Sequence, residues 1–265
     1  MSDTALTERP AGRPAEIPPR TGSWTVLTTL LRWTLAQMGP MLPLIVVVQA
    51  LLAAGIIIGF GLLIPDVDGG AAAFLSTGAP TVLLLTVGLV IVPQGVAQAK
   101  SNGTFTYQRA LPVPRVLVLL ADLVVWLLVA LPGVAVAVVV AQLRFDLDYS
   151  IAWPVLVLAS MLTALTATAV GYAVAVVLPP MLAQVISQVL VFFVLLFSPI
   201  TFPAERLPGW FQDVHAVLPV QPAGDLVRAG LLSESYDASG RDLLVLLVWC
   251  VVGLAVTVRA LVRRD

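Results

Sequence analysis

Six long apolar runs divide the chain, and nearly every charged residue lies between them. A helix needs about 20 apolar residues to cross the core of a bilayer, and each run is about that long. Backbone groups in lipid must satisfy one another, which a helix allows. The sequence therefore predicts an all-α membrane protein with six transmembrane helices. The predicted spans cover about residues 41–64, 79–99, 116–141, 152–178, 181–202 and 243–260.

Composition and charge support this fold class and indicate an orientation. Hydrophobic residues make up 59% of the chain and charged residues only 11%, whereas a soluble domain carries about 25% charged residues. The spans use most of the 265 residues, which leaves no room for a sizeable soluble catalytic domain. Lys and Arg gather in alternate gaps between the spans, ten on one side and four on the other. The positive-inside rule then predicts a multi-pass protein of the cell (plasma) membrane with both termini in the cytoplasm.

The N-terminal region precedes the first span and divides into two parts. Residues 1–22 are polar and rich in proline, which predicts a disordered cytosolic tail. Residues 23–38 have an apolar stripe at helical spacing and a Trp near their start. Such a helix either lies in the membrane interface or extends the first span, and the break at Gly39-Pro40 favours the interface. Residues 39–265 then form the six-span transmembrane domain.

The loop between the second and third spans, residues 100–115, is expected on the cytoplasmic side. Asn102-Gly103 is a turn signal. Residues 104–111 can form two short helical turns before Pro112 stops them. A short helix held away from the membrane suits docking onto a soluble partner, and an ordinary polar connector is the alternative.

Residues 199–241, between the fifth and sixth spans, are too many for a simple turn. Apolar and aromatic side chains recur there at helical spacing, interrupted by Pro203, Pro208, Pro219 and Pro222. This pattern predicts short, half-buried helices at the outer face of the membrane. Asp225 and Arg228 are three residues apart on one predicted helix, so they can pair.

Several kinds of chemistry lack the residues that they need. The chain has one histidine, His215, and one cysteine, Cys250, too few for a zinc site. His215 is therefore expected to be an interface residue. The one lysine, Lys100, follows Ala99, so it cannot be the lysine of a P-loop. The sequence predicts a protein that is not itself an enzyme and that holds no metal or cofactor directly.

Asp122 is the one ionisable residue well inside a predicted span. It comes seven residues after Arg115, about 10 Å deep at 1.5 Å per residue. An intramembrane carboxylate is a functional candidate by default. Because no Glu, His, Lys or Arg shares its depth, we favour a structural hydrogen bond to a neighbouring helix over a proton relay.

Uncharged polar side chains form stripes on three predicted spans, and the stripe on the fourth span consists of Ser160, Thr163 and Thr166. Such stripes face the interior of a bundle or a subunit interface rather than lipid. Amides followed by phenyl rings suit an amphipathic or apolar cargo better than an inorganic ion. The candidate residues of a translocation path are Gln94 and Gln98 on the second span, and Gln184, Gln188, Phe192 and Phe193 on the fifth.

Two stretches resemble the permease subunits of ABC-2 type exporters, the family that includes daunorubicin-type drug efflux permeases and exporters of lipids and polysaccharides. One stretch lies before the third span and the other follows the fifth span. Together with six spans and cytosolic termini, the resemblance extends over essentially the whole chain. The matching residues are Gly103-Thr104, Pro112 and Arg115 in the first stretch, and Pro203, Leu207-Pro208-Gly209-Trp210, Leu218-Pro219 and Asp225-Leu226-Val227-Arg228 in the second.

The resemblance implies roles for three segments. Residues 23–38 look like the interfacial connecting helix, residues 103–111 like the coupling helix that seats in the ATPase, and residues 203–228 like outer re-entrant helices that close the exit. The implied coupling residues are Gly103, Thr104, Phe105, Tyr107, Arg109, Pro112 and Arg115, and the implied outer gate comprises Trp210, Phe211, Leu218, Asp225 and Arg228. One departure is that residues 99–106 lack the acidic residues that the family usually has there.

The resemblance also implies partners and a function. The partners are a soluble P-loop ATPase, which would bind ATP and Mg, a second permease subunit of the same or a related chain, and membrane lipids; no nucleic acid is expected. The expected function is ATP-driven export of an amphipathic or apolar compound, drug or lipid-like, as in antibiotic resistance. An ion-coupled secondary transporter and, less favoured, an intramembrane enzyme are the alternatives. Asp122 alone is thin support for the former, and paired intramembrane carboxylates for the latter are missing.

Overall fold

The computed structural model of the protein describes residues 22–63, 69–110, 112–145, 149–204 and 207–262. These residues form helices joined by turns, with no strand among them. Six helical runs within this part of the chain are long and apolar enough to cross a membrane. The expected fold class, an all-α protein with six spans, is therefore confirmed. The expected disordered tail lies, up to residue 21, outside the described residues.

The helices follow the predicted spans closely, with one clear difference. Span two begins at Gly69, ten residues before the apolar run predicted from residue 79, because Ala-rich turns extend the helix outward. The spans are α2 (Leu42–Leu63), α3 with the turn η2 and α4 (Gly69–Thr86, Val87–Ile91, Val92–Ser101), α6 (Arg115–Phe145), α7 (Trp153–Val177), α8 (Pro180–Phe197) and α11 (Gly240–Val262). The shorter helices are α1 (Ser23–Met38), α5 (Thr104–Ala110), α9 (Gly209–Val217) and α10 (Val220–Leu231).

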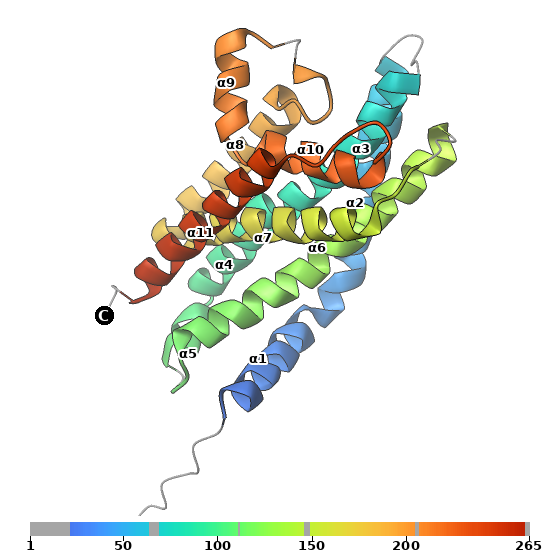
Figure 1. Ribbon diagram of the computed structural model, residues 1–265. Coiled ribbons are helices and arrows are strands. Elements are labelled where there is room, and N and C mark those ends of the chain that lie inside the picture. The colour runs from blue at the N-terminus through green and yellow to red at the C-terminus, as the bar shows by residue number, and fades with distance from the viewer. Residues whose placement is uncertain (1–21, 64–68, 111, 146–148, 205–206, 263–265) are drawn as a thin grey trace, which may run out of the picture.

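Helix α7 lies at the centre of the bundle, packed against α6, α10, α11 and the turn η2 (Figure 1). Where η2 crosses α7, two glycines let the backbones approach closely. A Cβ atom added to Gly171 would lie only 2.0 Å from the carbonyl oxygen of Gly88. A side chain larger than hydrogen is therefore excluded at Gly88 and at Gly171.

The turn η2 is π-helical, with one residue more than an α-helical turn accommodates. Pro93, the second residue after this turn, has no N–H for the carbonyl of Leu89. Wider turns of this kind are a common response to a disrupted hydrogen-bond ladder in a helix. The irregularity therefore follows from the proline in the second span.

The Gly-x-x-x-Gly spacing of Gly55 and Gly59 in α2 indicates close helix packing from the sequence. Within this chain the structure does not use it, because a Cβ atom added to either glycine would meet nothing within 4 Å. Spacing alone cannot distinguish a glycine on the surface of a bundle from one at a helix crossing. The close crossing is formed by Gly88 and Gly171, which no local motif marks.

Helix α1 joins α2 through a tight 3-10 turn at Gly39–Met41, where the sequence predicts a break. The run from Ser23 to Gly59 contains 37 residues. At 1.5 Å per residue it is about 55 Å long, and a bilayer core is about 30 Å thick. The run is therefore longer than one perpendicular crossing requires. Helix α1 packs along α6 (Figure 1) through Leu31 and Leu35, whereas Trp24 is 75% exposed.

Candidate functional site

The segment that connects span two to span three turns sharply before α5. Gly103 has a φ of +81°, a left-handed conformation that favours glycine. The side-chain oxygen of Asn102 accepts a hydrogen bond from the backbone N–H of Thr104 at 3.1 Å. The Asn-Gly pair therefore ends α4 and starts α5 within two residues, which agrees with the turn expected at this position.

The side chains of α5 divide into an inward and an outward set. Phe105 is 9% exposed and packs in the core, whereas Tyr107 is 62% exposed and Thr106 is exposed. Thr104 is half-buried and Pro112, after the helix, is exposed, while the side chain of Arg109 lies outside the described part of the chain. Phe105 thus seats the helix on the protein, and Tyr107 is available to a partner.

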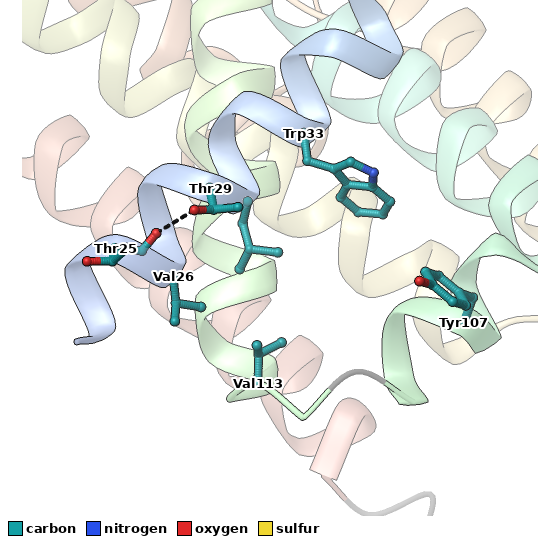
Figure 2. Close-up of a pocket in the computed structure, with 7 residues that line it drawn as sticks. Thr25, Val26, Thr29, Trp33, Tyr107 and Val113 are labelled. Carbon is teal, nitrogen blue, oxygen red and sulfur yellow. Dashed lines mark hydrogen bonds between the residues drawn. The ribbon is translucent and has the colours of Figure 1, made fainter. Parts of the chain in front are cut away.

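A pocket of about 410 Å³ separates α5 from α1. Figure 2 shows Trp33 of α1 and Tyr107 of α5 facing this pocket, with Val113 at its lower edge. The hydroxyl of Thr29 donates to the carbonyl oxygen of Thr25 on the α1 side. Since α1 packs on α6, the exposed face of α5 stays uncovered by α1.

The four candidate glutamines of the translocation path lie on the molecular surface. Gln94 and Gln98 of α4 and Gln184 and Gln188 of α8 are all exposed, and α4 packs beside α8. At 1.5 Å per residue, Gln94 lies about 10 Å from the end of α4 and Gln188 about 12 Å from the start of α8. Both pairs therefore occur at matching depths, near the ends of their helices that adjoin α5 and the α7–α8 turn.

The remaining polar and aromatic candidates on these spans separate into surface and interior groups. Phe192 is 55% exposed on the same helix as the α8 glutamines. Ser187, between those glutamines, is buried and donates to the carbonyl of Ala183 at 2.7 Å. The hydroxyl residues of span four are also buried; they are Ser160, Thr163 and Thr166. The amide stripe is thus an outward feature, and the hydroxyl stripe faces inward.

Helices α9 and α10 lie over one end of the bundle, beyond α8 (Figure 1). Phe193 of α8 stacks on His215 of α9, with ring centroids 5.8 Å apart, and meets the edge of Phe211 at 6.2 Å. Trp210 is 69% exposed. Leu218 is half-buried at the corner between α9 and α10, where its N–H donates to Val214.

His215 was expected to be an interface residue, and within this chain it is fully buried between aromatic rings. Burial lowers the pKa of its imidazole, so the neutral form is favoured. The residue packs α9 onto α8. The residues next to His215 in the sequence do not indicate this role, because the phenyl rings that surround it come from two helices.

Arg228 of α10 is 2% exposed and has several partners. Its Nη1 donates to the carboxylate of Asp225 at 2.7 Å, Nε to the Thr77 hydroxyl at 3.2 Å, and Nη2 to the Ile200 carbonyl at 3.2 Å. The guanidinium also lies 3.7 Å from the ring centroid of Phe74. Burial lowers the pKa of this group and Asp225 opposes that shift. Arg228 therefore ties α10 to α3 of span two and to the segment after α8.

Trp249 of α11 is a contact that sequence reasoning missed. Its indole N–H donates to the carbonyl of Val217, the last residue of α9, at 2.8 Å. This hydrogen bond joins span six to the outer helices. A tryptophan within a predicted span gives no local sign of such a partner.

Asp122 of α6 accepts hydrogen bonds from two other helices. The Tyr172 hydroxyl of α7 donates to one carboxylate oxygen at 3.0 Å, and the Thr34 hydroxyl of α1 to the other at 3.4 Å. The carboxylate thus joins three helices, in the manner of the structural hydrogen bond that the sequence suggested.

Six helices long and apolar enough to cross a membrane, in the part of the chain that the structure describes, define a multi-pass membrane protein. The chain belongs to the ABC-2 family of transporter proteins, because the model of that family matches residues 65–259. Members of this family are membrane subunits for transport and typically work with an ATPase partner. The comparison with curated proteins found no match.

Proposed function

We propose that this protein is the permease subunit of an ATP-driven exporter that moves an amphipathic or apolar compound, a drug or a lipid-like molecule, out of the cell. The family assignment supports a permease over the alternatives of an ion-coupled transporter and an intramembrane enzyme. The observation that carries the proposal is the row of exposed amides on α4 and α8.

Amide side chains within a membrane are unfavourable against lipid and find partners at helix interfaces or in water-filled cavities. Gln94, Gln98, Gln184 and Gln188 therefore require a cover that the described residues of this chain do not supply. A second permease subunit, the same or a related chain, covers them in our proposal. The exposed ring of Phe192 adds an apolar surface to the space enclosed between the subunits, which suits a cargo with both polar and apolar parts.

The energy for transport comes from a soluble P-loop ATPase that binds ATP and Mg and contacts α5. This places α5 and both termini on the cytoplasmic side of the plasma membrane and α9 and α10 on the outer side. Helix α1 lies in the membrane interface in this arrangement, and α9 with α10 closes the exit through Trp210, Phe211 and Leu218. The exposed Tyr107 supports the docking role of α5.

A single cysteine at position 94, or a single cysteine at position 188, in a Cys250→Ala background should form a disulfide between neighbouring permease subunits when membranes are oxidised. The reason is that both positions lie on the proposed subunit interface. Non-reducing electrophoresis and mass spectrometry detect the products and identify the second chain. The matched control is Val248→Cys, which is 52% exposed on α11 and should remain monomeric. Cross-linking at 248 without cross-linking at 94 or 188 would place the interface elsewhere.

Tyr107→Asp should weaken co-purification of the ATPase several-fold while leaving the yield of folded permease unchanged. Exposed aromatic side chains often supply the main binding energy of an interface, and Tyr107 is 62% exposed. Phe105→Asp is a poorer test, because Phe105 is buried and its replacement disturbs the permease itself. The control is Ser235→Asp, an exposed position near the outer helices. Equal retention of the ATPase by both variants would contradict docking at α5.

A further inference from the structure

The two basic residues that flank α5 each reach the carboxyl end of a different span. Lys100 lies in the last turn of α4, and its ammonium donates to the carbonyl oxygens of Ala175, Val176 and Leu178, the last two at 3.0 Å. Arg115 is the first residue of α6, and its Nη1 donates to the carbonyl of Leu261 at 2.6 Å. The segment that contains α5 is therefore attached at its start to α7 and at its end to α11.

The end of α7 needs a donor from outside the helix. The last four carbonyls of a helix have no partner within it. Here the N–H of Leu178 donates to Val174, but the next two residues, Pro179 and Pro180, have no N–H to offer. A lysine ammonium has three donors, and here it donates to the carbonyl oxygens of Ala175, Val176 and Leu178. Its positive charge is also favourable at the negative end of the helix dipole.

Phe105 of α5 packs between these two attachments. The Lys100 ammonium lies 5.7 Å from the centre of the Phe105 ring. On the other side, Phe105, Arg115 and Leu261 line a single small cavity of about 20 Å³. With its main side chain buried and both flanks bonded, α5 is held against the ends of α7 and α11. The next residues after α7 begin α8, which carries Gln184 and Gln188.

We propose that Lys100 and Arg115 are positioning residues that transmit movement of α5 to the spans. Through Lys100, a movement of α5 shifts the α7–α8 junction and with it the amide stripe of α8. Through Arg115, the same movement shifts α11. This inference rests on the proposed function, because the force on α5 comes from the ATPase.

The test measures the distance between spin labels on α5 and α8, at Ala110 and Met181, which are both exposed. The background is Cys250→Ala, and the full-length permease is measured alone and with its ATPase. Wild type and Lys100→Arg, which keeps the donors, should give one narrow distance distribution. Lys100→Met should raise the population of detached α5 by about tenfold, since charged hydrogen bonds are lost. The control Arg241→Met, at an exposed position, should resemble wild type.

The same variants are then compared in the complex with the ATPase. Lys100→Met and Arg115→Met should still bind the ATPase. In both variants, the change that ATP causes in the distance between labels at Gln184, in the amide stripe, and Val248 should be several-fold smaller than in wild type. Narrow distributions in both methionine variants, or detachment of α5 without loss of that change, would overturn the proposal. If Lys100→Met does not fold, Lys100→Gln, with a shorter neutral side chain, takes its place in every comparison. Failure of wild type to bind any ATPase contradicts the proposed function instead, and the measurement on the permease alone still decides whether Lys100 holds α5.

Discussion

Arg228→Ala should remove most of the folded protein from the membrane and abolish transport. Arg228 is 2% exposed, and its loss removes the hydrogen bonds that it donates to the carboxylate of Asp225 and to the carbonyl of Ile200. Breaking a buried ion pair costs about 3–5 kcal/mol. We expect the lower end of that range, because Asp225 is 37% exposed and water can reach it. Thermal unfolding of the purified protein and the yield of monodisperse material in detergent measure the effect.

The matched controls separate the loss of geometry from the loss of charge. Arg228→Lys keeps the charge but not the planar fork that reaches Thr77 and Ile200, so it should give an intermediate loss. Arg241→Ala, at an exposed position, should stay close to wild type. A wild-type unfolding temperature for Arg228→Ala would show that the outer helices do not depend on this residue.

The exchange of the two charges, Asp225→Arg with Arg228→Asp, should not restore the fold. If only Asp225 and Arg228 are considered, without their neighbours, the swap is expected to restore part of the function. In the structure, however, a carboxylate at position 228 would face the carbonyl of Ile200, which is an acceptor and cannot donate. The site is therefore asymmetric, and the environment rather than the pair decides which residue occupies it.

Asp122→Leu should lower the yield and the thermal stability of the protein, whereas Asp122→Asn should stay near wild type. Leucine leaves the hydroxyl of Tyr172, which is 3% exposed, without its acceptor. An unsatisfied buried group costs about 1–3 kcal/mol. Asparagine keeps one acceptor oxygen, and hydroxyl groups can act as donor or acceptor toward its amide.

The double variant Asp122→Leu with Tyr172→Phe tests this explanation. Removing both partners of a buried hydrogen bond is far less costly than removing one, so the second change should recover part of the stability lost in the first. The unfolding temperatures of the two single variants and the double variant measure the coupling. A well-folded Asp122→Asn that transports nothing would instead support the proton-coupled alternative.

Much of the fold was predictable because lipid imposes strong local constraints. Any run of about 20 apolar residues must become a helix, so the six spans follow from composition along the chain. The helical loop after Asn102-Gly103 and the short helices between spans five and six also follow from local signals, since turn residues and prolines act within a few positions. The pairing of Asp225 with Arg228 is local in the same sense.

The sequence by itself thus determined the number of spans, their approximate ends and the residue types available to each segment. Only the tertiary structure decided which residues meet across the bundle: Lys100 with the end of α7, Arg228 with Thr77, and His215 with the ring of Phe193. It also decided that the glutamines of α8 lie outside while Ser187 between them lies inside. These outcomes depend on how each helix is rotated and on which distant helix covers it. Apolar runs of nearly uniform composition do not encode that rotation locally.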